Sequence, residues 1–364
     1  MITKQFGTKK LPLKSGATMK DIATMAGVSQ ATVSYVLSGR EGVRISDATR
    51  QRVKRIATEL QYRPHAIARG LARGNTQTIG VYAHTEEAVL SGLWRTEVMR
   101  GVAEELLAHN YHLLLYGYRT SAPEPPVSLF LDGRVDGLIF LSPHMGDTLP
   151  NALEVVRMPT VFVGTHEFQS SRVSCVDCDS ISGAIQAVEH LIQLGHRRIA
   201  HLCGPSIAPN ARDRVTGYKL AMEKHGLPIL PEMLISGGFS EEEGYQATCT
   251  MLVKGTRVTA IFAANDVSAI GAIRACHEFR VRIPEDISVI GFDDVPFCEI
   301  THPKLTTIRQ PATELGQQAV RSLLQIISSG AGAPSAVIMP TELVVRESTG
   351  CVPAVLSGVS SRSI

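Results

Sequence analysis

The chain of 364 residues is predicted to fold into a small all-α unit followed by a much larger α/β unit with two subdomains. Three observations support this prediction. Between residues 18 and 63, apolar residues recur at helical spacing. From residue 77 onward, short aliphatic runs alternate with helical stretches, which is typical of doubly wound parallel sheets. These runs are too numerous for one sheet of ordinary width, and the length itself favours two or three domains.

Composition excludes several broad classes of protein. Hydrophobic residues make up 44% of the chain and charged residues 19%, as in a soluble globular protein. No apolar run approaches the roughly 20 residues that cross a bilayer. Residues 1–17 are basic and lack the apolar core of a secretory signal, so we expect a disordered lead-in there. Seven scattered cysteines, an odd number, favour a reducing cytoplasm over a disulfide scaffold.

The small net charge of +2 conceals a strong asymmetry. Residues 1–76 carry 14 lysines and arginines against 4 acidic residues, whereas the rest of the chain carries 22 against 30. A basic segment joined to an acidic body is the electrostatic pattern of a polyanion-binding module attached to a separate regulatory or catalytic unit.

The first helix is predicted at Met19–Ala26. Ile22, Met25 and Ala26 fall on one face at i, i+3, i+4 spacing, so we expect them to point inward. Gly27 follows, and glycine tolerates the left-handed conformation that lets a chain leave a helix sharply.

The second helix is predicted to begin after the N-cap Ser29 and to run to about Leu37. Val33, Val36 and Leu37 are expected to face inward. The outward residues are then Gln30, Ala31, Ser34 and Tyr35. This is a helix-turn-helix pattern, whose second helix inserts its N-terminal residues into the DNA major groove.

A third helix is predicted between the N-cap Ser46 and the stop signal Pro64. Its inward stripe is Val53, Ile56, Ala57 and Leu60. Its outer face carries four basic side chains that can contact DNA phosphates: Arg50, Arg52, Lys54 and Arg55. Residues 18–63 therefore form a core too small for an enzyme site and sufficient for a DNA-binding headpiece.

The stretches "MKDIATMAGVSQATVSYVLSG" and "ISDATRQRVKRIATELQYRPHAIARGLARGNTQTIGV" resemble the N-terminal module of the LacI/GalR family of bacterial transcriptional regulators. The resemblance continues through "HLIQLGHRRIAHLCGP", "AIFAANDVSAIGAI", "IPEDISVIGFDD" and "PKLTTIRQP", and it covers residues 18–349. It implies an all-α helix-turn-helix headpiece joined to an α/β, periplasmic-binding-protein-like effector domain with two lobes.

The resemblance implies DNA contacts by residues of the headpiece. The expected set is Thr18, Ser29, Gln30, Ala31, Thr32, Ser34 and Tyr35. Gln30 and Ala31 match positions that face base edges; glutamine reads adenine with two hydrogen bonds, and alanine suits a thymine methyl. Ser29 and Ser34 are expected to hold phosphates, which position the helix without specifying sequence.

Residues 64–76, with "PHAIARGLARG", match the family's hinge helix and linker. Leu71 stands where the family places a leucine wedge that kinks the minor groove, and Ala68 lies one turn earlier on the same face. His65 stands where the family often has asparagine. The segment is expected to fold only on DNA, which would couple the two units.

The effector-binding and dimerisation domain is expected at residues 77–350, followed by a tail at 351–364. We expect lobe 1 at about 77–180 and 310–336, and lobe 2 at about 181–309 and 337–350. The tail lacks the leucine heptads of a tetramerising coiled coil.

Ligands of open α/β sheets bind at the carboxyl ends of strands, which predicts an effector site in the cleft between the lobes. The matched motifs imply Arg214 as a bidentate anchor for an oxygen-rich ligand and Asp293 as a hydroxyl acceptor. Phe239 is expected to stack on a sugar ring. The remaining candidates are Asn265, Gln310, His84, Trp94 and His166.

Other groups of residues are not predicted to form a redox, metal or catalytic site. The "CVDC" of Cys175–Cys178 has no second cysteine pair and no thioredoxin-type context. The twelve histidines show no paired ligand spacing, so no metal and no cofactor are expected. No nucleophile and base are placed together, and an enzyme is not expected.

The leading hypothesis is a dimeric, sequence-specific repressor that binds a palindromic operator and is controlled by a small polar effector such as a sugar or sugar acid. We expect it to be cytoplasmic and nucleoid-associated. One alternative keeps the fold but makes a purine-like ligand a corepressor. Another is a cytoplasmic sugar-binding protein with no role on DNA, which the basic headpiece disfavours.

Overall fold

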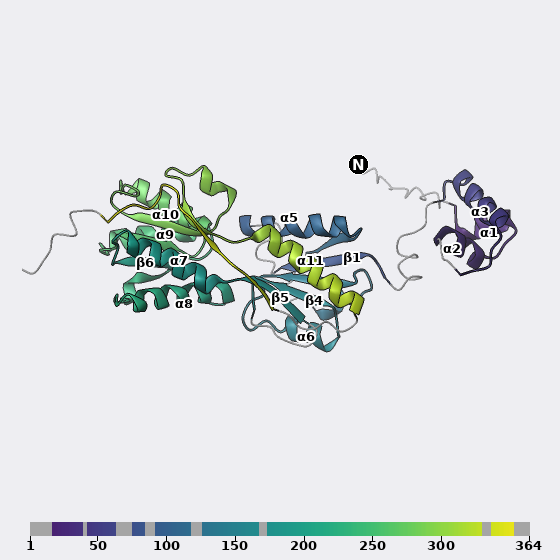
Figure 1. Cartoon of the computed structure of the whole chain (residues 1–364), viewed down its shortest axis with the longest axis horizontal. Helices are drawn as coiled ribbons and strands as arrows, with labels where there is room; N and C mark the ends of the chain where they lie inside the picture. Colours follow the sequence, from purple (N-terminus) through teal and green to yellow (C-terminus); the bar gives the residue numbers. More distant parts are fainter. Residues whose placement is uncertain are drawn as a thin grey trace, which may run out of the picture. The chain divides into compact units, whose positions relative to one another are not determined.

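The chain divides into two compact units, residues 1–76 and residues 77–364 (Figure 1). A computed structural model describes residues 17–38, 42–62, 75–83, 92–117, 126–166, 173–329 and 336–352. Its helical headpiece and two-sheet α/β body confirm the predicted fold class.

The headpiece consists of α1 (Met19–Ala26), α2 (Gln30–Ser38) and α3 (Asp47–Glu59). The ends of these helices are capped by neighbouring residues in the sequence. Thr18 and Asp21 form a capping box at the start of α1, and Gly27 ends that helix with φ +62°. At the start of α3, the Ser46 hydroxyl accepts a hydrogen bond from the Thr49 amide.

The headpiece core is a small cluster contributed by all three helices: Ile22, Ala23, Ala26, Val33, Val36, Val53, Ile56 and Ala57. Met25 was expected inside and is 57% exposed. The buried face of α1 is rotated toward Ala23, because two alanines let the neighbouring helices approach closely. Met25 then falls on the edge of the outer face.

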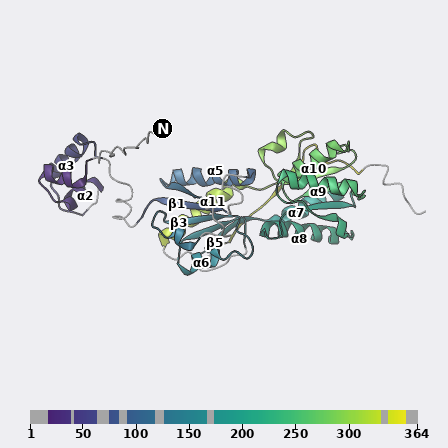
Figure 2. The ribbon, with the colours of Figure 1, turned by 180° about the vertical axis from the view of Figure 1, so that it is seen from behind.

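Lobe 1 is built on a six-stranded sheet in which every neighbouring pair is parallel. Its strand order is β11 (Ala336–Met339), β5 (Val173–Cys178), β4 (Thr160–Val163), β3 (Gly137–Leu141), β1 (Thr78–Ala83) and β2 (His112–Tyr116). One face is covered by α5 (Leu93–Ala108) and α11 (Ala312–Ser329). Across the sheet lie η1 (Val127–Phe130) and α6 (Leu149–Val155) (Figure 2).

Lobe 2 repeats this plan with a second six-stranded sheet. The strand order is β12 (Glu342–Val344), β10 (Thr306–Arg309), β9 (Ser288–Asp293), β8 (Ala260–Ala263), β6 (Ile199–Cys203) and β7 (Leu234–Ser236). Only β12 runs antiparallel to its neighbour among these described strands. One face carries α9 (Glu241–Val253) and α10 (Asp266–Glu278), and the other carries α7 (Ser180–Gln193) and α8 (Pro209–Lys224). Two short 3-10 turns, η2 (Pro231–Met233) and η3 (Pro296–Glu299), complete the lobe.

Each sheet contains the doubly wound order in which the first strand lies between the second and the third. The order reverses beside β1 in lobe 1 and beside β6 in lobe 2. In such sheets ligands bind outside the carboxyl ends of the strands at this point.

The chain passes between the lobes after β5, after β10 and after β11. The last passage follows Met339, where we expected it at about residue 336, because Ala336–Met339 pair with β5 in lobe 1. The sequence also predicted a helix through Gly217 to His225, and α8 begins at Pro209 and ends at Lys224.

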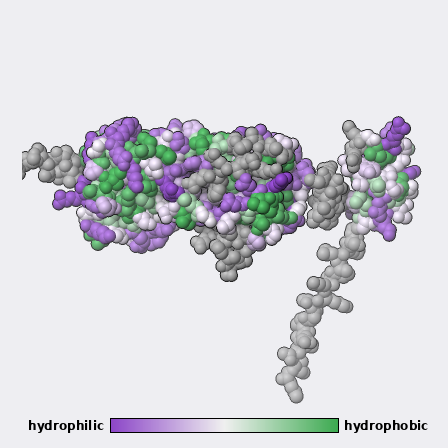
Figure 3. All heavy atoms as spheres, turned by 90° about the horizontal axis from the view of Figure 1, so that it is seen from below, coloured by the Kyte–Doolittle hydropathy of each residue, from purple (hydrophilic) through white to green (hydrophobic). Residues whose placement is uncertain are grey.

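Across the described residues, no helix is both long and apolar enough to cross a membrane. On the face drawn in Figure 3, hydrophobic side chains form separate patches among hydrophilic ones.

Candidate functional site

A cavity of about 300 Å³ lies between the two lobes, at the carboxyl ends of strands from both sheets. This volume is at the lower end of the range for small-molecule sites. Six of the eight predicted effector-binding residues line it: Trp94, Arg214, Phe239, Asn265, Asp293 and Gln310. A more open depression of about 640 Å³ borders it. Its other lining residues include many charged side chains that form ion pairs with one another. In one of them, Arg346 Nη2 lies 2.7 Å from Asp294 Oδ1.

Arg214 is a fully buried cation in α8 that reaches the cavity. Its guanidinium carbon lies 3.9 Å from the Phe292 ring centroid and 5.9 Å from that of Phe239. One terminal nitrogen donates to the Ala264 carbonyl, and the other lies 3.7 Å from Asp293 Oδ1. Among the described residues its Nε–H has no acceptor. The planar guanidinium is therefore held in place at the cavity wall, with one N–H left unsatisfied.

Asp293 ends β9 with a backbone φ of +128°, which turns the chain sharply at the cavity wall. Burial raises the pKa of its carboxyl to about 8, against the opposing charge of Arg214; Asp266 raises it and a hydrogen bond from Gln310 lowers it. A carboxyl with this pKa can both donate and accept hydrogen bonds near neutral pH. That property suits a ligand rich in hydroxyl groups.

Gln310 connects this carboxyl to the opposite lobe. It follows β10 at one of the passages between the lobes, and its amide nitrogen donates to Asp293 Oδ1. Its amide oxygen accepts from the Cys178 thiol at 2.8 Å. Burial raises the pKa of Cys178, which keeps this thiol protonated as a donor. Cys175 and Cys178 lie three residues apart in β5, so their side chains point to opposite faces of the sheet.

Asn265 and Phe239 line the cavity and also stabilise the structure around it. The Asn265 side chain caps α10 by accepting from the Ser268 amide at 2.9 Å. Its amide nitrogen donates to the Phe239 carbonyl at 3.0 Å. The half-buried Phe239 ring also packs where a Cβ on Gly204 would otherwise lie.

Trp94 closes the cavity from lobe 1. It lies in the first turn of α5, packed against the lobe 1 core. Its Nε1–H is buried and has no acceptor within the described part of the chain. Its ring adds an apolar surface to the cavity wall that Arg214, Phe239 and Asp293 also line.

Sequence patterns missed several residues of the cavity wall: Arg95, Ser142, His144, Asn210 and Glu241. Ser142 was detectable, because it directly follows β3 and strand ends line such sites. Asn210 lies in the first turn of α8.

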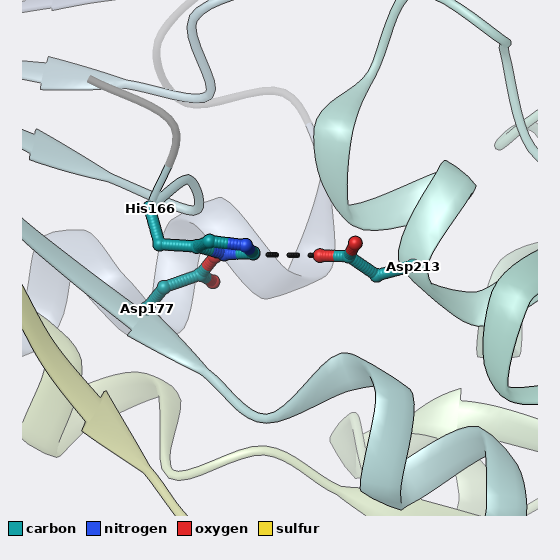
Figure 4. Close-up of side chains that lie close together, drawn as sticks. All are labelled: His166, Asp177 and Asp213. Atoms are coloured by element: carbon teal, nitrogen blue, oxygen red, sulfur yellow. Dashed lines mark hydrogen bonds and ion pairs between the residues drawn. The ribbon is translucent and has the colours of Figure 1, made fainter.

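The two other predicted effector residues, His84 and His166, are not among the described residues that line the cavity. His84 lies outside the described residues. His166 is absent from the described cavity wall and follows β4. Its Nδ1 lies 3.2 Å from Asp177 Oδ2 and 3.8 Å from Asp213 Oδ2 (Figure 4).

The headpiece presents the N-terminal end of α2 to solvent. Gln30 and Ala31 are exposed, whereas Thr32, Ser34 and Tyr35 are half-buried. The Ser29 hydroxyl caps α2 by accepting from the Thr32 amide at 3.1 Å, and Thr18 caps α1 in the same way. The predicted hinge residues His65, Ala68 and Leu71 lie outside the described part of the chain.

Comparison with known proteins matches two family models. Residues 18–65 match the family of bacterial regulatory proteins, lacI family, and residues 188–349 match a periplasmic binding protein-like domain. The HTH-type transcriptional repressor PurR of Haemophilus influenzae is 34% identical over 338 residues, covering 91% of this chain and 98% of that protein.

Two solved structures share the fold over nearly the whole chain. The lac repressor dimer bound to operator and the anti-inducer ONPF matches with a TM-score of 0.78 and 30% identity, covering 92% of this chain and 100% of that one. A complex of the transcriptional regulator CelR with cellobiose matches with a TM-score of 0.70 and 31% identity, covering 91% and 99%.

Proposed function

The chain belongs to the LacI family of bacterial regulatory proteins and is a DNA-binding transcriptional regulator, and we propose that it acts as a homodimeric repressor released by a small polar effector. The proposed operator contacts are those of the exposed start of α2, with Gln30 and Ala31 facing base edges. Hinge contacts by His65, Ala68 and Leu71 belong to the same proposal.

The observation that carries the effector proposal is the buried pair of Arg214 and Asp293 at the wall of the cavity between the lobes. The pair supplies an unsatisfied Nε–H and a carboxyl that can donate or accept. Trp94 and Phe239 add apolar ring faces beside these polar groups. This combination suits a sugar or sugar acid, whose ring has an apolar face and a rim of oxygens. The CelR complex with cellobiose supports the same class.

Isothermal titration calorimetry tests this assignment with a panel containing cellobiose, ribose, gluconate and adenine. We expect one sugar or sugar acid to bind the wild-type chain, with a matching change in the fluorescence of Trp94, the single tryptophan. Arg214→Ala should weaken that binding at least about 30-fold, because it removes the buried cation proposed to anchor the oxygens of the ligand.

Lys219→Ala is the matched control, since Lys219 is an exposed cation on the same helix α8. It should leave binding unchanged. Normal binding by Arg214→Ala would remove the cavity assignment, and binding of adenine alone would favour the purine-like alternative.

Inducer and corepressor differ in the sign of their coupling to DNA. An inducer binds more weakly when operator is present, and a corepressor binds more tightly. Repeating the titration on the operator complex therefore separates the two. A protein with no role on DNA would show neither operator binding nor any coupling.

A further inference from the structure

We propose that His166, Asp177 and Asp213 form a site for a divalent transition-metal cation that links the two lobes. His166 follows β4 and Asp177 lies in β5, both in lobe 1. Asp213 lies in α8 of lobe 2, directly before Arg214 (Figure 4). The three side chains converge from segments that are distant in sequence, at a place separate from the described wall of the effector cavity.

The spacing of the three potential ligand atoms fits a metal ion. His166 Nδ1 lies 3.2 Å from Asp177 Oδ2 and 3.8 Å from Asp213 Oδ2, and all three groups offer ligand atoms within 4.8 Å of one another. In a tetrahedral zinc site with bonds of about 2.0–2.2 Å, ligand atoms are about 3.3–3.6 Å apart. A small movement of Asp213 toward lobe 1 completes such a triangle.

A second observation points to a cation at this place. The Asp177 side chain is only 2% exposed. Its Oδ1 accepts from the Cys178 amide at 2.8 Å, which fixes Oδ2 toward His166. Within the described residues, the ion pair found for this carboxylate is with His166, which carries a positive charge only when it is protonated. A buried carboxylate needs a positive partner, and a metal shared with a neutral imidazole supplies one.

The donor set indicates the class of metal. One imidazole and two carboxylates suit Zn²⁺, Co²⁺ or Ni²⁺, whereas Ca²⁺ and Mg²⁺ take sites made of oxygen atoms. Three protein ligands leave a further position for water.

The site would stabilise the arrangement in which the lobes touch. On the same side of the cleft, the Met145 amide of lobe 1 donates to the Ile207 carbonyl of lobe 2 at 2.8 Å. A metal held by two ligands from lobe 1 and one from lobe 2 favours this contact. Because Asp213 precedes Arg214 in α8, the metal also holds the predicted effector anchor close to lobe 1.

The test is calorimetric titration of ZnCl2 into the full chain at pH 7.5, after treatment with EDTA and with the cysteines kept reduced. We expect one Zn²⁺ per chain, bound at least tenfold more weakly by His166→Ala and by Asp213→Asn. Co²⁺ should give visible absorption bands of a four- or five-coordinate site in the wild type and lose them in both variants. Both side chains are partly exposed, so the variants should keep the wild-type circular dichroism spectrum.

Two control variants account for other zinc ligands. His109→Ala removes an exposed histidine that faces the single carboxylate of Glu105 at 3.2 Å, and Cys351→Ser removes an exposed thiol. Both should bind Zn²⁺ as the wild type does. The proposal is overturned if the wild type binds no Zn²⁺, or if His166→Ala and Asp213→Asn bind it unchanged. Operator and sugar binding are measured without metal, so their outcome is independent of this test.

Discussion

Asp293 is a residue of the cavity wall whose ionisation is strongly shaped by the folded state. Burial raises the pKa of its carboxyl to about 8, while in the unfolded chain it titrates near 3.8. Between about pH 4 and pH 8 the folded protein therefore binds a proton that the unfolded chain lacks. The free energy of unfolding should fall as the pH rises through this range, by at most about 1.4 kcal/mol per pH unit from this group.

Asp293→Asn removes this titration and should flatten the pH dependence between pH 5 and pH 8. Urea unfolding followed by Trp94 fluorescence at several pH values measures the difference from wild type. Asp266, whose pKa is also raised by burial, is present in both proteins; because its charge raises the pKa of Asp293, the difference includes this interaction between the two carboxylates. Equal slopes in the two proteins would mean that the folded carboxyl titrates at its ordinary pH.

The positions of residues that stand in recognisable motifs could be predicted, whereas the contacts that tertiary structure creates between them could not. Arg214, Asp293 and Gln310 each stand in a motif of the family, and the structure brings them to one cavity. Their mutual contacts, including the thiol of Cys178 on Gln310, depend on the passages between lobes. The convergence of His166 with Asp213 follows from the closeness of the two lobes, which no local pattern encodes.

The contact between α5 and α11 decides the packing of lobe 1. A Cβ on Gly101 of α5 would overlap the carbonyl oxygen of Thr313, and one on Gly316 of α11 would overlap that of Val98. Backbone atoms cannot move aside to relieve such an overlap, whereas the end of a flexible side chain can. The two helices therefore touch at reciprocal glycines, and their distance is fixed there.

Gly101→Ala should lower the free energy of unfolding of this unit by about 1–3 kcal/mol, because overpacking outweighs the better helix propensity of alanine. Gly117→Ala is the matched control in the same lobe. Nothing lies within 4 Å of its Cβ position, so we expect a change within about 0.5 kcal/mol. Urea unfolding followed by Trp94 fluorescence measures both. An unaffected Gly101→Ala would mean that the helices can separate freely.

Strands were easier to predict than the helices that cover them. The central parallel strands are fully buried, and their aliphatic runs, such as residues 137–141, stand out in the sequence. From the sequence we predicted helices in the body at about 94–109 and 182–194, through 217 to 225, and at 269–279. None was predicted at 241–253 or 312–329, where α9 and α11 lie. The buried face of α9 consists mostly of small residues, Gly244, Ala247 and Thr248, which weakens its hydrophobic signal. In α11, however, Leu315, Ala319 and Leu323 recur every four residues, so a periodic signal was present.

At the scale of the whole molecule, the two units carry net charges of opposite sign, which suits them to different roles. The basic residues lie in the part of the chain that includes the headpiece, and the body that encloses the cavity is acidic. Affinity for DNA should therefore fall steeply with salt, since phosphate contacts release counterions. The acidic body should reduce binding of DNA elsewhere on its surface by like-charge repulsion.

If the protein acts as a two-fold dimer, its preferred DNA should itself have two-fold symmetry. Selection from a random-sequence library should yield an imperfect palindrome, and light scattering should give about twice the chain mass of 39.3 kDa. A duplex with one intact half-site and one scrambled half-site should bind about 10²–10⁴-fold more weakly than the palindrome, because the second headpiece then loses its intramolecular contact. Fluorescence anisotropy at a fixed salt concentration measures both duplexes. A selected consensus without two-fold symmetry, or equal affinity for the two duplexes, would mean that each headpiece reads DNA alone.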